Sequence, residues 1–304
     1  MQMIWKIRSM IELIQNRIET KALAKTKLSE LGVTPDDAKR DVPVVVSLTS
    51  YPGRIEIVHK TIKTLLNQTI KPDKVILWLA DEQFPDRIVP DSLMELVEYG
   101  LDIMWCDDIR SFKKLIPTIE MYHDAIIVTA DDDNYYSVNW LEKLLSSYQK
   151  YPGAISAHKV TQFSIDNGTW QWNAGGRKYY KTPSYLNKLV GVGGVLYPPN
   201  CLHDDITNRE LFMKLAPTND DQWFWFMAVL KETPIVVVDN PIIHAKPVEG
   251  TLTSGLWTIN DSEEGNFGKQ FNALINYYPE VNERMKKEYL QRLEGKNTCQ
   301  SLSR

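Results

Sequence analysis

Short apolar runs alternate with amphipathic segments along the middle of the chain. Four runs have the pattern of buried strands because turn-forming residues bound them: 43–48, 74–79, 101–106 and 125–130. Four other segments carry apolar side chains at helical spacing: 57–66, 92–99, 115–122 and 138–148. Repeated strand–helix units predict an α/β fold of the Rossmann-like type, with a mostly parallel central sheet and helices on both faces.

The pattern is less regular after Pro152. Further strands are predicted at 154–160, 190–196 and 234–238, and an antiparallel excursion at 169–180 follows the Asn167-Gly168 turn. Helices are predicted at 221–230, 270–275 and 281–293. Since no repeat or long linker divides the chain, we expect one α/β domain over residues 41–280, followed by a C-terminal helix and tail over 281–304.

The first 40 residues have a different pattern of apolar and charged positions from the rest of the chain. Isoleucines recur at spacings of 3, 4, 3 and 4 along an apolar helical stripe: Ile4, Ile7, Ile11, Ile14 and Ile18. Basic side chains lie around and beyond this stripe, so residues 1–40 predict an amphipathic helical extension with a net charge of +3. Such a helix either lies on an anionic membrane surface or packs on protein, against this domain or a second copy.

Composition narrows the class of protein. The chain has 304 residues, 43% of them hydrophobic and 24% charged, as in ordinary globular proteins. Its net charge of −4 excludes the broad basic field of a nucleic-acid-binding protein. No apolar stretch is long enough to span a bilayer, charges interrupt a signal-peptide pattern, and three scattered cysteines favour a reducing compartment. We therefore expect a cytoplasmic protein, with membrane contact limited to the cytoplasmic face of the inner membrane.

Three consecutive acids, Asp131, Asp132 and Asp133, directly follow the fourth predicted strand. Ligands of open α/β sheets bind beyond the carboxyl ends of strands, and clustered carboxylates repel one another unless a cation joins them. Side chains alternate along an extended strand end, so Asp131 and Asp133 point the same way. With diphosphate oxygens they form a site suited to Mn²⁺ or Mg²⁺. The simpler alternative is an acidic turn that caps the next helix.

Three later features also have a functional and a structural interpretation. The glycines of Gly191-Val192-Gly193-Gly194 allow the backbone to approach a ligand closely, or simply form a tight turn. The pair Asp220-Asp221 supplies a general base, or acids favoured at a helix N-terminus. His244, after the strand at 234–238, is either a metal ligand or a structural histidine.

The order of these motifs resembles that of GT-A nucleotide-sugar glycosyltransferases. A first strand followed by Thr49-Ser50-Tyr51-Pro52, four strand–helix units and an Asp-x-Asp strand end carry the resemblance, which covers roughly residues 42–275. The chain is most similar to bacterial enzymes that build capsule or lipopolysaccharide. The resemblance implies metal-dependent transfer of a sugar from a UDP- or GDP-sugar to a hydroxyl of a glycan or lipid-linked glycan, with inversion favoured.

The resemblance also implies roles for individual residues. The metal ligands would be Asp131, Asp133 and His244. The donor would contact Thr49, Tyr51, Arg54, Asp81, Lys114, Asp131 and Asp132. The acceptor would lie against Gly193, Gly194, Trp170 and Trp172. Asp221 would be the catalytic base, with Asp220 as the alternative, because the family motif more often reads Glu-Asp.

Two other functions remain open at this point. A sugar nucleotidyltransferase also combines a Rossmann-like sheet with metal-binding carboxylates. It normally has a Gly-rich basic loop after the first strand, whereas residues 49–54 contain a single glycine. A non-catalytic module that binds glycans or nucleotide sugars is the other alternative, although the retained acidic motifs favour an enzyme.

Overall fold

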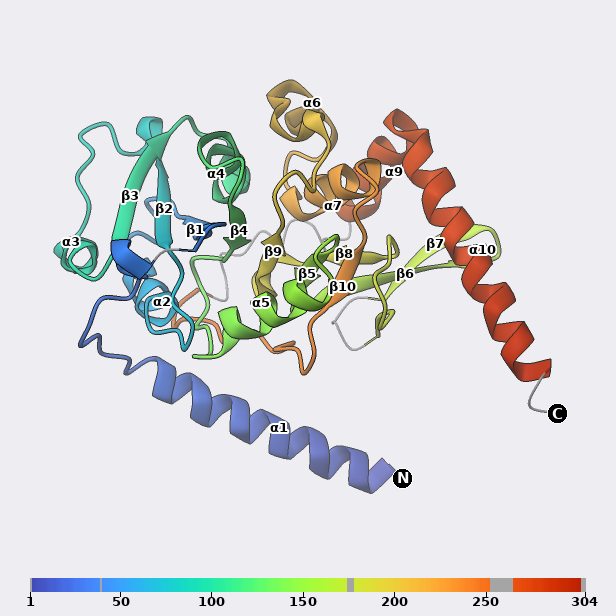
Figure 1. Ribbon diagram of the computed structural model, residues 1–304, viewed down its shortest axis with the longest axis horizontal. Coiled ribbons are helices and arrows are strands. Elements are labelled where there is room, and N and C mark those ends of the chain that lie inside the picture. The colour runs from blue at the N-terminus through green and yellow to red at the C-terminus, as the bar shows by residue number, and fades with distance from the viewer. Residues whose placement is uncertain (1, 39, 174–177, 252–264, 302–304) are drawn as a thin grey trace.

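The computed structural model describes residues 2–38, 40–173, 178–251 and 265–301 (Figure 1). Within these ranges the main sheet has seven strands, in the spatial order β10 (Ile235–Val237), β5 (Ile155–Ala157), β9 (Val195–Tyr197), β4 (Ile126–Thr129), β1 (Val44–Thr49), β2 (Lys74–Ala80) and β3 (Leu101–Cys106). Neighbouring strands pair in parallel, except that β9 runs antiparallel to β4 and β5. The predicted α/β fold with a mostly parallel sheet is confirmed.

The strand order reverses direction beside β1. From β1 the chain continues to β2 and β3 on one side, and it later returns to place β4 on the other side of β1. Connections on opposite sides leave a crevice beyond the carboxyl ends of β1 and β4, which is where open α/β sheets bind ligands. The topology therefore indicates the position of a site before any side chain is considered.

Helices cover both faces of the sheet, because successive side chains of each buried strand point in opposite directions. Val44, Val46 and Leu48 face one way, and Val45 faces the other. The first face packs against α2 (Val58–Leu65), α3 (Asp91–Val97) and α5 (Trp140–Lys150). The second packs against η3 (Arg110–Lys114), α4 (Ile116–Met121) and the largely apolar α7 (Asp220–Leu230), next to α6 (Arg209–Leu215) and α9 (Asn266–Tyr277).

Two predicted strands are wrong in detail. The run at 154–160 divides into β5 of the main sheet and the start of β6 (Val160–Asp166), which belongs to a second sheet. The run at 190–196 includes the 3-10 turn η4 (Gly191–Gly193), so only its end belongs to β9. Gly194 has a φ of +89°, which a regular strand does not tolerate, and this residue separates the turn from β9.

The predicted antiparallel excursion forms a small second sheet. Its strands have the order β7 (Thr169–Asn173), β6 and β8 (Asn187–Leu189), all antiparallel within the described residues. Asn167 and Gly168 connect β6 to β7 with φ angles of +48° and +76°, as a tight hairpin turn requires. Residues 174–177 of the predicted excursion lie outside the described residues.

The chain ends are helical. At the N-terminus, α1 (Gln2–Leu23) runs beside the body of the domain (Figure 1). Its last turn is attached, since Leu23 packs on Tyr135 and Val248 and Glu19 pairs with Lys246 at 3.3 Å. No helix in the described part of the chain is both long and apolar enough to cross a membrane.

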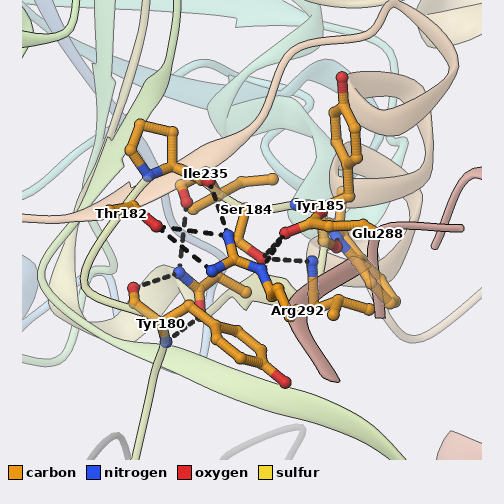
Figure 2. Close-up of polar contacts among 11 residues, drawn as sticks. Tyr180, Thr182, Ser184, Tyr185, Ile235, Glu288 and Arg292 are labelled. Carbon is orange, nitrogen blue, oxygen red and sulfur yellow. Dashed lines mark hydrogen bonds and ion pairs between the residues drawn. The ribbon is translucent and has the colours of Figure 1, made fainter. Parts of the chain in front are cut away.

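The C-terminal helix α10 (Pro279–Ser301) holds the segment that leads into β8 (Figure 2). Glu288 accepts hydrogen bonds from Ser184 Oγ at 2.6 Å and from the Tyr185 amide at 2.8 Å, and it pairs with Arg292. The Arg292 guanidinium also lies 4.4 Å from the centre of the Tyr180 ring. These contacts of Glu288 and Arg292 join α10 to residues 180–186 and so fix the position of the segment that precedes β8.

Candidate active site

A cavity of about 760 Å³ opens at the carboxyl ends of β1 to β4, where the strand order reverses. It brings together most of the residues that the sequence predicted: Thr49, Tyr51, Arg54, Lys114, Asp131, Asp132, Asp133, Trp172, Asp220 and Asp221. Five predicted residues are not among its lining: Asp81, Trp170, Gly193, Gly194 and His244. The acidic motifs from two distant parts of the chain therefore share one cavity.

The loop after β1 is tied to the acid cluster through Asp132. Ser50 Oγ donates to one carboxylate oxygen of this buried residue at 2.6 Å, and Arg54 donates to the other at 2.6 Å. Burial raises the pKa of Asp132, which the guanidinium of Arg54 opposes. Arg54 also lies 2.9 Å from Asp133 and faces the Tyr51 ring at 5.7 Å. Asp132 thus positions Arg54 at the cavity, next to Asp133.

Asp131 and Asp133 carry like charges that repel each other. Burial and the neighbouring Asp131 raise the pKa of Asp133 to about 6. Beside them, the buried amide oxygen of Asn134 has no hydrogen-bond partner among the described residues. These are all hard oxygen donors, and a divalent cation would relieve the repulsion between the acids. The residues present therefore fit Mn²⁺ or Mg²⁺, although no group of three His, Cys, Asp or Glu side chains in the described ranges is placed to hold a metal by itself.

Lys114 connects the two acidic motifs. Its buried ammonium lies 2.9 Å from both Asp131 and Asp220, and 4.0 Å from Asp221. Burial alone would lower the pKa of Lys114, but these three carboxylates raise it well above its ordinary value. Lys114 is therefore a permanent cation between the end of β4 and the start of α7.

Asp221 has the environment of a base. Its carboxylate accepts a hydrogen bond from the Gly191 amide at 2.9 Å. Burial raises the pKa of Asp221, and the neighbouring Asp220 adds to this effect while Lys114 opposes it. A carboxylate with a raised pKa accepts a proton more readily than an ordinary surface acid. Asn219 caps the same helix by accepting from the Gln222 amide at 3.1 Å, so the helix start is fixed without using either acid.

The glycine run has two roles, and Gly191 is the residue at the site. A Cβ at Gly191 would lie 2.8 Å from both Asp221 Oδ1 and Lys114 Nζ. A Cβ at Gly194 would instead lie 2.4 Å from the indole of Trp140, whose Nε1 donates to the Gly193 carbonyl at 2.8 Å. The predicted pair Gly193 and Gly194 thus accommodates a tryptophan of the core, while its neighbour Gly191 approaches the catalytic candidates.

Alanine substitutions should separate these two glycines. In Gly191→Ala, the ends of two side chains move to make room, so we expect a folded protein with greatly reduced turnover. In Gly194→Ala, an indole ring and a positive φ oppose the new methyl, so we expect a loss of stability of about 1–3 kcal/mol. Urea denaturation and a turnover assay on both variants check this. A stable and fully active Gly191→Ala protein would contradict the close approach at Asp221.

The predicted residues outside the cavity lining have protein partners. Asp81 accepts a hydrogen bond from Arg87 at 2.7 Å on the surface. Trp170 donates to Asn282 at 2.9 Å and contacts the ring of Phe163. The donor contact of Asp81 and the acceptor contact of Trp170 stay predictions, and neither residue lines the cavity.

His244 lies on a segment that runs beside the acidic loop. The Val248 amide donates to the Asp133 carbonyl at 2.8 Å, and the Tyr135 amide donates to the Lys246 carbonyl at 2.8 Å. His244 itself lines a separate, very small cavity behind that loop. The structure does not group it with Asp131 and Asp133, and its role as a metal ligand stays a prediction.

Sequence reasoning missed several lining residues. Gln83 follows β2, and Asp108 and Ser111 follow β3; Gln83 donates to Asp108 at 2.8 Å. Gln83 Oε1 and Ser111 Oγ are buried and have no hydrogen-bond partner among the described residues. Lys188 of β8 and Lys159, which directly precedes β6, also line the cavity. Their position after the second and third strands is the signal that could have identified Gln83, Asp108 and Ser111, whereas nothing in the local sequence marks the two lysines.

Comparisons with known proteins find distant likenesses of fold. No protein-family model matches the chain, and no curated protein matches its sequence. The mannosyltransferase PcManGT from Pyrobaculum calidifontis, in complex with GDP-Man and Mn²⁺, is 13% identical over 90% of this chain and 76% of its own, with a TM-score of 0.49. S. aureus TarS (residues 1–349) is 14% identical over 66% of this chain, with a TM-score of 0.45. This chain spans 58% of that TarS chain.

A nucleotidyltransferase is among the likenesses as well. The CMP:2-keto-3-deoxy-manno-octonic acid synthetase complexed with CTP is 10% identical over 73% of this chain and 99% of its own, with a TM-score of 0.42. At TM-scores below 0.5 such likenesses do not decide between reactions. The reaction has to be inferred from the cavity residues.

Proposed function

We propose that this protein is a metal-dependent glycosyltransferase that moves a sugar from a nucleotide-sugar donor to a hydroxyl of a glycan or glycolipid acceptor. One observation carries the proposal: Lys114 joins the Asp131 motif to the Asp220-Asp221 motif inside one cavity. Sugar transfer from a nucleoside diphosphate needs a site for an anionic leaving group beside a base for the acceptor hydroxyl. The two motifs supply these two requirements, a few ångströms apart.

The donor would lie along the edge formed by β1 to β4. Gln83 and Ser111 offer unpartnered polar atoms to the nucleoside, and Tyr51 offers an exposed ring. Asp131 and Asp133 would hold Mn²⁺ or Mg²⁺ together with diphosphate oxygens. When bound, the cation supplies Lewis-acid stabilisation of the leaving diphosphate.

Asp221 would act on the acceptor. Its carboxylate takes the proton of the acceptor hydroxyl as that oxygen bonds to the anomeric carbon and the nucleoside diphosphate departs. The Gly191 amide and Lys114 hold the carboxylate in place during this transfer. A base on the acceptor side favours an inverting reaction. The resemblance to capsule and lipopolysaccharide enzymes supports bacterial surface polysaccharide synthesis as the setting.

The products of a donor assay distinguish this function from its alternatives. We expect UDP or GDP, with Mn²⁺, to stabilise the protein, by about 2.7 kcal/mol at a hundredfold excess over Kd. We also expect slow hydrolysis of one UDP- or GDP-sugar to release a nucleoside diphosphate. Release of pyrophosphate from a nucleoside triphosphate and a sugar phosphate would show a nucleotidyltransferase instead. Donor binding without turnover on any acceptor would show a binding module.

We further propose that α1 associates with an anionic membrane surface, where lipid-linked acceptors would lie. Ile11, Ile14 and Ile18 are 48%, 50% and 64% exposed on one side of the helix. Exposed basic residues, Arg17 and Lys21, lie nearby. Apolar and basic side chains together are typical of helices that lie in anionic interfaces.

Vesicle co-sedimentation tests this association. Replacing the three isoleucines by serine should weaken binding to anionic vesicles about a hundredfold, at about 1 kcal/mol for each half-exposed side chain. Ile88→Ser is the matched control, because Ile88 is 76% exposed elsewhere on the surface. Deletion of residues 1–40 is less suitable, since Arg40 pairs with Asp73 at 2.9 Å in the domain. A dimer that dissociates in the triple variant, without vesicle binding by the parent, would make α1 an oligomer interface.

A further inference from the structure

Two lysines line the wall of the cavity that lies next to the second sheet. Lys188 lies in β8 and pairs across the ladder with Thr161 of β6, so these two residues share one face of the sheet. Lys159 directly precedes β6. The side chains of Lys159, Thr161 and Lys188 line the cavity, so this wall carries two cationic groups.

Both lysines lie close enough to the candidate base Asp221 to act on it electrostatically. Asp221 is the charged neighbour that acts on Lys159, and Lys188 in turn lowers the pKa of Asp221. Asp133, by contrast, has Asp131, Arg54 and Asp132 as its charged neighbours. The lysines are thus near the candidate base, on whose side of the cavity the acceptor would bind.

Lys159 is a cation that lacks a fixed partner. No hydrogen bond or ion pair engages its ammonium within the described ranges, and burial lowers its pKa. A desolvated ammonium is costly unless an anion joins it, so this position favours a negatively charged ligand group. Neutral sugar hydroxyls would not offset the desolvation free energy of two ammonium groups on one wall.

An apolar platform lies next to Lys188. Trp172 is 43% exposed, and its ring lies 4.9 Å from that of Phe267. The Lys188 ammonium is 5.6 Å from the centre of the Phe267 ring. A sugar ring stacked on Trp172 would therefore bring a charged substituent within reach of Lys188, on the wall that Lys159 also lines.

We propose that the acceptor is an anionic glycan, whose phosphodiester or carboxylate group binds Lys159 and Lys188 while a sugar ring stacks on Trp172. This inference rests on the proposed function, because it assigns the acceptor side of that site. It names the chemical class of the acceptor, which the acidic motifs alone leave open.

Binding of small probes tests the proposal without requiring turnover. The probes are the methyl glycoside of a neutral hexose, that of the corresponding hexuronic acid, and the hexose phosphate, each titrated by NMR with nucleoside diphosphate and Mn²⁺ present. At least one charged probe should bind the parent protein tenfold or more tightly than the neutral probe. The tighter of the two charged probes identifies the anion as carboxylate or phosphate. Equal binding of all three overturns the proposal.

Charge-neutralising variants then assign the effect to the lysines. Lys159→Met and Lys188→Met should each reduce the preference for the charged probe at least tenfold, while Lys188→Arg, which keeps the charge, should retain most of it. Lys214→Met, on the exposed side of α6, is the matched control. A preference that persists in both methionine variants overturns the proposal.

Donor affinity distinguishes acceptor binding by the two lysines from diphosphate binding by them. It also distinguishes failure of this inference from failure of the proposed function. The dissociation constant of the nucleoside diphosphate should stay unchanged in both methionine variants. A marked loss of donor affinity would mean that the lysines bind the diphosphate, which overturns the assignment to the acceptor. Absence of donor binding and hydrolysis in the parent protein would refute the proposed function itself, whereas the probe titrations would still report on the anion site.

Discussion

Asp221→Asn is expected to lower kcat by on the order of 10²–10⁴ while leaving donor affinity nearly unchanged, as loss of a general base does. The asparagine side chain keeps its size and its ability to accept from the Gly191 amide, but it cannot take a proton. The change also removes one of three carboxylates around Lys114, and two remain to hold that ammonium. Steady-state rates of nucleoside diphosphate release, with the donor Kd measured separately, check the prediction.

Asp220→Asn is the matched control for the choice of base. Asp220 lies 2.9 Å from Lys114 and is more buried than Asp221, so we expect its loss to affect stability more than proton transfer. The pH dependence of the reaction rate is a second test of which acid is the base. Since the pKa of Asp221 is raised, the rate should fall as the pH drops through that raised value, because a protonated carboxyl accepts no proton. A larger rate loss in Asp220→Asn would assign the base to that residue.

Local pattern was enough to predict the main strands and the acid cluster. The run from Lys74 to Leu79 forms the buried strand β2 as predicted, because an apolar run bounded by turns has few alternatives to a buried strand. The run from Leu101 to Cys106 also forms a strand, β3, but it is at the edge of the sheet and only Leu101 is buried. Asp131 and Asp133 were predicted as a site because parallel strands end at the same edge of a sheet. Arg54 and Tyr51 were predicted through the resemblance, as residues that follow the first strand, and both line the cavity.

The contacts that connect the motifs could not be predicted in this way. Lys114 is a charged residue in a helical stretch, and only the folded chain shows that it bridges acids from β4 and α7. Gly191 and Gly194 have similar sequence neighbours, yet one approaches Asp221 and the other Trp140. Lys159 and Lys188 line one cavity because β6, which Lys159 directly precedes, pairs with β8, and the sequence gives no register for this pairing. Each case depends on contacts between residues far apart in the chain.

Asp133→Asn is expected to remove the metal-dependent part of donor binding while preserving the fold. The substitution takes away one anionic oxygen of the Asp131–Asp133 pair, and an amide is a much weaker ligand for Mn²⁺ or Mg²⁺ than a carboxylate. It also removes a charge that burial and Asp131 disfavour, as the raised pKa of about 6 shows. The melting temperature without ligand should therefore stay the same or rise slightly.

Thermal shift measurements with UDP or GDP, each with and without Mn²⁺, provide the readout for this variant. The parent protein should gain about 2.7 kcal/mol at a hundredfold excess over Kd, and the variant should lose most of this gain. Asp239→Asn is the matched control, because Asp239 is exposed and pairs only weakly, with Lys150 at 3.4 Å. An unchanged Mn²⁺-dependent shift in Asp133→Asn would remove Asp133 from the metal site. The Arg54 guanidinium, now 2.9 Å from Asp133, would then be the cation that neutralises this acid during the reaction.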